Sequence, residues 1–246
     1  MENEKIDGGA TIKTTVSSKL ENFWYHYKWH TLIALFVVFV ITVCTLQMCE
    51  KESYDTNVLY AGGHAVSRQN EEADYSEYQK LLTSFKSFSK DYNEDGKVSV
   101  SLRDLYTPTE DELRAAGDDV YYSRFYEDKE ILTSTMMTGG YFLCFFSPEV
   151  FESYDKIEND GARVFADLSY LVPDGVTVEY YNDAKTGIKL SSLGIYSLSG
   201  ISSLPENTVV CLRNTSFSTH LDDDKNERDY TRAKEMLVKM LSFDAE

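Results

Sequence analysis

The pattern of hydrophobic and polar positions divides this chain into a short polar start, one long apolar run and a mixed remainder. The apolar run reads TLIALFVVFVITVCTLQMC, from Thr31 to Cys49, and holds no charged residue. At 1.5 Å per residue, a helix of this length crosses most of a hydrocarbon core about 30 Å thick. The pattern therefore predicts one transmembrane helix, which we place at residues 29–49.

The residues on either side of the apolar run indicate its orientation. The preceding FWYHYKWH carries tryptophan and tyrosine rings, which are favoured at the level of lipid headgroups. Lys13, Lys19 and Lys28 lie before the run, and acidic residues follow it from Glu50. Because basic flanks stay in the cytoplasm, residues 1–28 are expected to be a cytoplasmic tail and the remainder extracellular. A cleaved signal peptide is disfavoured, since the run is long and lacks a small-x-small cleavage site.

A folded domain is expected at residues 57–246, after a short linker at residues 50–56. Tyr141–Phe146 (YFLCFF) and Thr208–Asn214 (TVVCLRN) are apolar on both faces, which is typical of strands buried between layers. Lys97–Leu105 alternates apolar and polar residues, as a half-exposed strand does. Further strands are expected at Asn57–Tyr60, Val176–Tyr181 and Gly187–Ile195.

Segments between these strands place apolar residues three and four apart, which predicts amphipathic helices. They are Asp74–Lys90, Glu110–Met137 with a break near Gly117, Pro148–Tyr154 and Asn226–Phe243. Strands buried on both faces and interleaved with helices predict a three-layer α/β domain after the single N-terminal transmembrane helix. Met1–Asn22 lacks hydrophobic periodicity and is expected to stay disordered.

The charge of the chain lies almost entirely in the predicted extracellular part. Lysine and arginine number 24 against 41 aspartates and glutamates, a net charge of −17. Four residues of each sign precede Trp29, so the whole excess of negative charge follows it. An acidic domain repels phosphate backbones, which excludes nucleic acid as an expected partner.

One loop has the spacing of calcium ligands. Asp91, Asn93 and Asp95, followed by Gly96, place oxygen atoms at the first, third and fifth positions of such a loop. The twelfth position, which should supply a bidentate carboxylate, is Leu102. Two interpretations stay open: a weak Ca²⁺ site completed by a remote carboxylate, or a turn stabilised by side-chain to backbone hydrogen bonds.

No catalytic motif occurs in the sequence. The GxSxG and HExxH patterns are absent, so we predict no enzyme and no cofactor other than that weak Ca²⁺. A hydrolase with an unrecognised site would require clustered carboxylates with shifted pKa values in a cleft. Cys144 and Cys211 lie in apolar strands and are either buried thiols or, if the strands adjoin, a disulfide.

Ligands of open α/β sheets bind beyond the carboxyl ends of the strands. Applied to the strands that begin at Asn57, Tyr141 and Thr208, this rule selects six candidate ligand-binding residues: Gly62, Gly63, His64, Ser147, Arg213 and Asn214. Of these, Arg213 is suited to pairing with an anionic group. Aromatic side chains near such a site, or alternatively in the plain core, are expected from Tyr121, Tyr122, Phe125 and Tyr126.

The order of NVLYAGG, DYNEDGKVSVSL, ILTSTMMTGGYFLCFFSPEVFESY and ARVFADLSYLVPDG resembles that of membrane-anchored envelope proteins of Firmicutes. Those proteins are related to extracellular solute-binding proteins of the type 2 periplasmic-binding-like class. In them a helix leads through a glycine into a strand like Tyr141–Phe146, and a residue like Glu149 starts a short helix. The resemblance spans Asn57–Phe243 and implies a single lobe, because two-lobed binding proteins are much longer.

Two functions follow as hypotheses. The chain is expected to be a membrane-anchored binding or interaction module that presents a small solute or a partner to a neighbouring membrane complex, which requires a concave patch at the strand ends. The alternative is a structural or assembly factor of an envelope complex. That function would show as an exposed apolar patch without a polar pocket.

Overall fold

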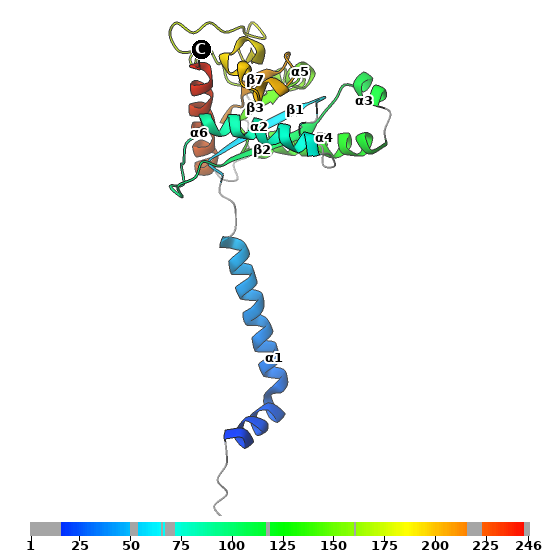
Figure 1. Ribbon diagram of the computed structural model, residues 1–246, viewed down its shortest axis with the longest axis vertical. Coiled ribbons are helices and arrows are strands. Elements are labelled where there is room, and N and C mark those ends of the chain that lie inside the picture. The colour runs from blue at the N-terminus through cyan, green and yellow to red at the C-terminus, as the bar shows by residue number, and fades with distance from the viewer. Residues whose placement is uncertain are drawn as a thin grey trace, which may run out of the picture. The chain divides into compact units, whose positions relative to one another are not determined.

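The computed structural model of the chain (Figure 1) is described here for residues 16–49, 54–64, 66, 72–116, 119–159, 161–215 and 223–243. The chain forms two compact units, Met1–Glu52 and Ser53–Glu246. The first contains helix α1 (Val16–Cys49), and the second contains all the other helices and strands.

Helix α1 contains the predicted apolar run and extends beyond it toward the N-terminus. Its segment Phe23–Thr45 is 23 residues long, and by length and composition it is able to cross a membrane. Large apolar side chains such as Phe36 are exposed along it, as on a helix that is hydrophobic all round. The prediction that Met1–Asn22 is disordered is wrong from Val16 onward, because a nucleated helix gains further turns easily. Residues 1–15 lie outside the described part.

The folded domain is built on a five-stranded mixed sheet in the order β2-β1-β3-β7-β6. Strand β1 (Thr56–Gly62) lies parallel to β2 (Val100–Tyr106) and to β3 (Leu143–Phe146). Strand β7 (Val209–Leu212) runs antiparallel to β3 and to β6 (Gly187–Lys189). The carboxyl ends of β1, β2 and β3 therefore meet at one edge of the sheet, whereas β7 ends at the opposite edge.

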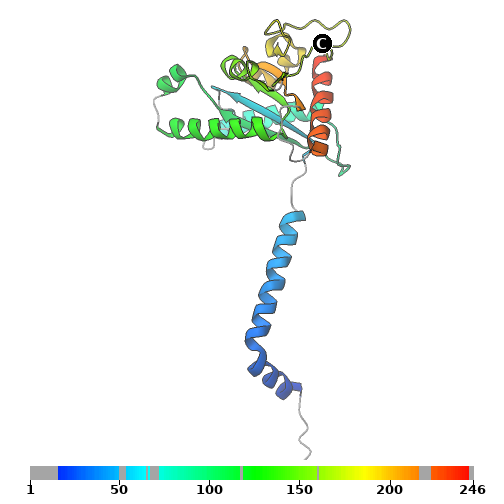
Figure 2. The same ribbon diagram turned by 180° about the vertical axis from the view of Figure 1, so that it is seen from behind.

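Helices cover both faces of this sheet. Helices α2 (Glu72–Phe88) and α6 (Asp223–Leu241) pack on one face, and α4 (Asp119–Thr138) and α5 (Pro148–Asp155) pack on the other. Figure 1 shows α2 in front of the sheet, and Figure 2, seen from behind, shows α4 in front. This arrangement confirms the mixed α/β fold and explains why the central strands are apolar on both faces.

Two strand predictions were wrong. Within Val176–Tyr181 only Tyr180 pairs, through an isolated bridge to Ile188, and β6 ends six residues before the predicted Ile195. Serine hydroxyls that bond to nearby carbonyls, such as that of Ser192, favour turns over continued strand at this point. These turns are three short 3₁₀ helices: η1 (Leu190–Ser192), η2 (Gly194–Ser197) and η3 (Ile201–Ser203). A small hairpin that was not predicted is formed by β4 (Glu158–Asn159) and β5 (Ala162–Arg163).

The break predicted near Gly117 separates α4 from a short helix α3 (Glu110–Ala116). Residues 117–118 themselves lie outside the described part. Because α3 follows β2 directly, it begins at the same edge of the sheet at which the three parallel strands end.

Candidate functional site

Backbone hydrogen bonds tie the three parallel strands together at their carboxyl edge. The N–H of Thr107, after β2, donates to the Gly62 carbonyl (2.8 Å), and the N–H of Ser147, after β3, donates to the Ala61 carbonyl (2.9 Å). The chain leaves β1 for β2 on one side and then crosses to β3 on the other. Such a topological switch point is where open α/β sheets bind ligands.

Helix α5 starts at this edge because its first residues suit a helix N-terminus. The Ser147 hydroxyl accepts the Val150 N–H (3.4 Å), and Pro148 occupies the first turn, where no N–H is needed. Glu149 lies in the same turn, where the helix dipole favours a negative charge. The sequence SPEV therefore fixes a carboxylate beside the ends of the strands.

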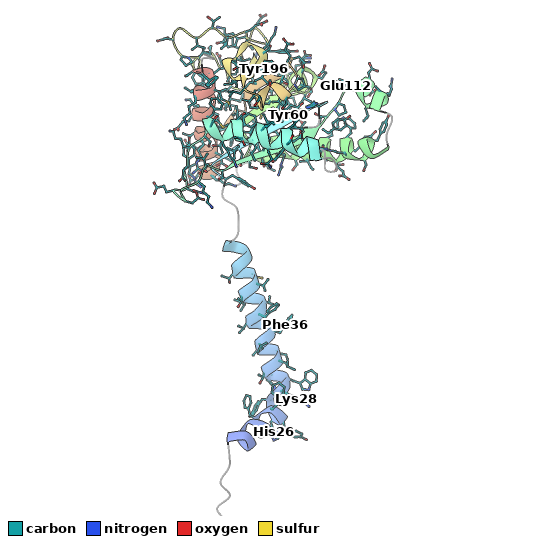
Figure 3. The ribbon with its side chains drawn as sticks, viewed as in Figure 1. His26, Lys28, Phe36, Tyr60, Glu112 and Tyr196 are labelled. Atoms are coloured by element: carbon teal, nitrogen blue, oxygen red, sulfur yellow. The ribbon has the colours of Figure 1, made fainter. Side chains whose placement is uncertain are left out.

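Helix α3 begins with a cap whose glutamate side chain lies next to Gly63, after β1. The Thr109 N–H and hydroxyl donate to Glu112 Oε2 (2.8 and 3.0 Å), and the Glu112 N–H donates back to the Thr109 hydroxyl (3.3 Å), which forms a capping box. A Cβ at Gly63 would lie 2.6 Å from that carboxylate oxygen, so a larger residue there would displace the Glu112 side chain from its cap. Figure 3 labels Glu112 on α3 and Tyr60 on β1.

Helices α3, α4 and α5 enclose a groove of about 580 Å³ at this edge, which we call the strand-end groove. Its volume lies within the range of small-molecule sites. The residues that line it include Pro108, Leu113, Leu132 and Val150, which are apolar, and four aromatic side chains: Tyr122, Phe125, Tyr126 and Tyr154. Three of the four aromatic residues predicted from sequence thus line the groove, and the side chain of the fourth, Tyr121, lies outside the described part.

Polar and charged side chains also line the strand-end groove, among them Thr107, Lys129 and Glu149. The Thr107 hydroxyl is buried and has no hydrogen-bond partner among the described residues. The Lys129 ammonium lies 5.5 Å from the centroid of the Phe125 ring, in range of a cation–π contact. Burial raises the pKa of Tyr154, so its phenol stays neutral at physiological pH. A groove that combines apolar, aromatic and polar side chains is able to bind and orient a ligand.

Four of the six predicted binding residues lie together at this edge. The Gly62 carbonyl and the Ser147 N–H take part in the backbone hydrogen bonds of this edge, and Gly63 lies next to Glu112 of α3. None of these residues, nor His64, lines the groove. His64 Nε2 lies 3.9 Å from Glu77 Oε2. The same strand-end rule, applied to the strand predicted at Lys97–Leu105, would have pointed to Thr107, and the following Pro108 marks that strand's end.

The other two predicted residues, Arg213 and Asn214, do not belong to this group. They follow β7, whose antiparallel direction places them beside Phe142, at the opposite edge of the sheet from Ser147. The sequence could not reveal this because strand direction is not encoded in an apolar run. Expecting these two residues to share a ligand with the other four was therefore wrong.

At that opposite edge, the Arg213 side chain is buried in contacts within the protein. Its side chain is fully buried, Nη1 donates to the Thr135 carbonyl (3.3 Å), and the guanidinium lies 5.4 Å from the centroid of the Phe142 ring. Burial lowers the pKa of Arg213. A contact of this kind joins α4 to the end of β7.

The predicted calcium loop is closed by its own side chains. Asp91 accepts the N–H of Gly96 (2.8 Å), Asn93 accepts that of Asp95 (3.1 Å), and Asp95 accepts that of Lys97 (2.8 Å). No group of three or more histidine, cysteine, aspartate or glutamate residues within the described ranges is arranged to hold a metal ion. The geometry favours the turn, and calcium binding stays a prediction to be tested.

Cys144 and Cys211 are direct partners in the register of β3 and β7, so the two strands do adjoin. Both residues are fully buried, and both are free thiols in this structure. Burial raises the pKa of Cys211 well above its ordinary value, which keeps it protonated and poorly nucleophilic. These thiols are therefore packing groups here, in line with one of the two alternatives left open by the sequence.

Comparison with known proteins found no matching protein-family model, curated protein or solved structure. The fold and the strand-end groove are thus the observations from which a function is argued.

Proposed function

We propose that this chain is a membrane-anchored extracytoplasmic binding module whose ligand occupies the strand-end groove. The groove is the single observation that carries the proposal, because it combines apolar residues, four aromatic side chains and a buried hydroxyl at Thr107 that has no hydrogen-bond partner among the described residues. Sites of this composition at the carboxyl ends of parallel strands are the usual ligand sites of open α/β sheets.

In the same proposal, α1 spans the cell membrane with its N-terminus in the cytoplasm, and Ser53–Glu246 lies outside the cell. The apolar segment Phe23–Thr45 and the lysines before it support this orientation. The domain is then a reduced, single-lobed relative of type 2 solute-binding proteins, acting as an accessory to a neighbouring membrane complex. Parallel strands covered by helices on both faces support that relationship.

The test is thermal unfolding of the Ser53–Glu246 domain against a panel of sugars, amino acids and short peptides. A ligand that binds only the folded state raises the melting temperature by mass action. Ser153 is an exposed residue of α5 that lines the groove, so the indole ring of Ser153→Trp should fill the groove and abolish any such rise in the melting temperature. Lys156→Trp, on the exposed end of the same helix, should retain it.

A saturable rise that Ser153→Trp removes and Lys156→Trp keeps would support the binding module. A rise that survives Ser153→Trp would place the ligand elsewhere. No rise in the melting temperature with any member of the panel would overturn the hypothesis that the groove binds a small solute. It would favour the alternative function, an assembly factor that acts through protein contacts. One observation favours that alternative: Tyr126 and Met137 expose 63% and 56% of their surface on α4.

A further inference from the structure

Exposed apolar side chains of the folded domain gather on one helix. Of the large hydrophobic residues that the domain exposes within its described part, Tyr126, Ile131 and Met137 lie on α4, and the remaining three are dispersed. The opposite side of α4 is buried against the sheet through Leu132 and Met136. Helix α4 therefore carries two large apolar side chains, Tyr126 and Met137, on a second, otherwise polar side, whereas a helix that covers a single sheet needs only one apolar stripe.

The exposed side of α4 carries a shallow, open hollow that adjoins the strand-end groove, and the residues that line this hollow all belong to α4. Tyr126, Glu130, Thr133 and Met137 are spaced by four, three and four residues, so they form one stripe along the helix. A hollow of about 760 Å³ lies along this stripe, and it shares Tyr126, Lys129 and Thr133 with the strand-end groove. We call the groove and the hollow together the α4 surface.

The dimensions of the α4 surface suit a second helix. From Tyr122 to Thr138, at 1.5 Å per residue, it extends about 24 Å, which a helix of about 16 residues would span. The small side chains of Thr133 and Ser134 lie between the large ones of Tyr126 and Met137, nearer to Met137. Small residues between large ones let a second helix approach to the usual interaxial distance, about 8–10 Å.

The charges beside the α4 surface are mostly negative. Glu127 and Glu130 on α4 and Glu149 on α5 are exposed, and within the described part of the chain none of the three is in an ion pair. Among the residues described, two cations line the surface: Arg114 on α3 pairs with Glu110 (3.1 Å) and Asp111 (3.7 Å), and Lys129, shared by the groove and the hollow, lies against the Phe125 ring. A ligand that brings positive charge would thus meet three carboxylates and one lysine, in a chain whose net charge is −17.

We propose that the α4 surface binds a cationic amphipathic helix of another envelope protein. The apolar side of that helix lies along Tyr126, Thr133 and Met137, one large side chain enters the strand-end groove, and its lysines or arginines face Glu127, Glu130 and Glu149. This is the helix-in-groove mode of recognition. The inference rests on the proposed function, since it names the partner class of the same groove.

A second copy of this chain is the competing occupant, and the charge argues against it. Two domains of strongly negative charge repel each other, and two α4 helices would bring Glu127 and Glu130 of both copies to one interface. A small apolar solute is a further competitor, but it would leave the exposed part of the stripe, from Glu130 to Thr138, uncovered.

The test uses the full chain in nanodiscs of zwitterionic lipid, with empty discs as the blank. The probe is a fluorescent 16-residue peptide with leucines at helical spacing and lysines elsewhere, and the control peptide has glutamate in place of every lysine. Fluorescence anisotropy is expected to show saturable binding of the lysine peptide alone, weakened by added salt. Dimerisation is checked on the same discs by crosslinking.

Matched variants separate a specific site from general attraction. Glu130→Lys and Glu206→Lys change the net charge equally, but Glu206 is exposed in the turn before β7. The first should weaken binding at least tenfold and the second less than twofold. Likewise Met137→Ala should weaken binding several-fold, whereas Ile157→Ala, another exposed apolar residue, should not.

Equal losses from Glu130→Lys and Glu206→Lys, equal binding of both peptides, or a dimer joined through α4 would overturn the inference. A solute that raises the melting temperature while the lysine peptide fails to bind would overturn it too, and would leave the proposed binding module standing. Failure of both the solute panel and the peptide would remove both proposals.

Discussion

Replacing Asp55 by asparagine should destabilise the folded domain by about 3 kcal/mol. Asp55 is buried before β1, and its Oδ1 accepts the N–H groups of Tyr92 (2.7 Å) and Asn93 (3.2 Å). Its Oδ2 accepts the N–H (2.8 Å) and the hydroxyl (3.0 Å) of Ser99. These bonds join the loop at Asp91–Gly96 to the start of the sheet.

The expected loss of stability follows from the number of hydrogen bonds that an asparagine side chain can still accept at this position. Its side chain has one acceptor oxygen, and its NH₂ group would face backbone N–H donors on the other side. One of the two sets of bonds is then lost, and a hydrogen bond to a charged group contributes roughly 1.5–3 kcal/mol. In a domain of this size a loss of about 3 kcal/mol lowers the melting temperature by about 6–12 °C.

The effect should depend on pH with a defined sign. Burial alone would raise the pKa of Asp55, but the hydrogen bonds from Ser99, Tyr92 and Asn93 outweigh it and the pKa is lowered. Because the folded pKa lies below the unfolded value of about 3.9, the stabilisation is complete above that value and is lost as the pH falls through the folded pKa. The gap between wild type and Asp55→Asn should therefore be constant above about pH 5 and shrink below about pH 4.

The assay is thermal unfolding of the Ser53–Glu246 domain, followed by circular dichroism from pH 7 to pH 3. Asp183→Asn, in an exposed turn where the carboxylate makes none of the described hydrogen bonds, is the matched control and should shift the melting temperature little. A shift for Asp55→Asn no larger than that of the control, or a gap that widens on acidification, would refute the reasoning.

Three further outcomes are expected. Cys144 and Cys211 should resist a thiol reagent in the folded domain and react on unfolding, because both are fully buried; fast reaction in native buffer would contradict this. Gly63→Ala should destabilise the domain by about 1 kcal/mol through the displaced cap, and by less in a Glu112→Ala background, as measured by urea unfolding. Millimolar calcium should leave the melting temperature unchanged, since the Asp91–Gly96 side chains bond to backbone N–H groups; a saturable rise reversed by a chelator would show a metal site.

Local patterns predicted most of the helices and the central strands. Tyr141–Phe146 and Thr208–Asn214 are mostly apolar on both faces. The structure explains this pattern, because both strands are buried between helices and few positions are left for polar residues. The predicted strand at Gly187–Ile195 failed after Lys189, where serine hydroxyls stabilise turns that apolar content alone does not reveal.

The candidate site was predicted in its position but not in its lining. The strand-end rule located Gly62 and Ser147 correctly at the carboxyl edge, yet the groove itself is lined by residues of α3, α4 and α5. Which helix face borders a groove depends on the crossing of β2 to β3, a long-range property. The direction of β7, which moved Arg213 to the other edge, is likewise set by tertiary pairing and not by its own residues.

The weak periodicity of α4 gains a physical meaning from the structure. A sequence such as DVYYSRFYEDKEILTSTMMT breaks the rule of one apolar face because Tyr126 and Met137 add a second, exposed one. Natural sequences break local rules mainly at functional sites. The net charge of −17 opposes the pairing of two copies through this face. Because charge interactions at physiological salt are screened beyond about 8 Å, the proposed helix would have to carry its positive charge close to the stripe that contains Glu130.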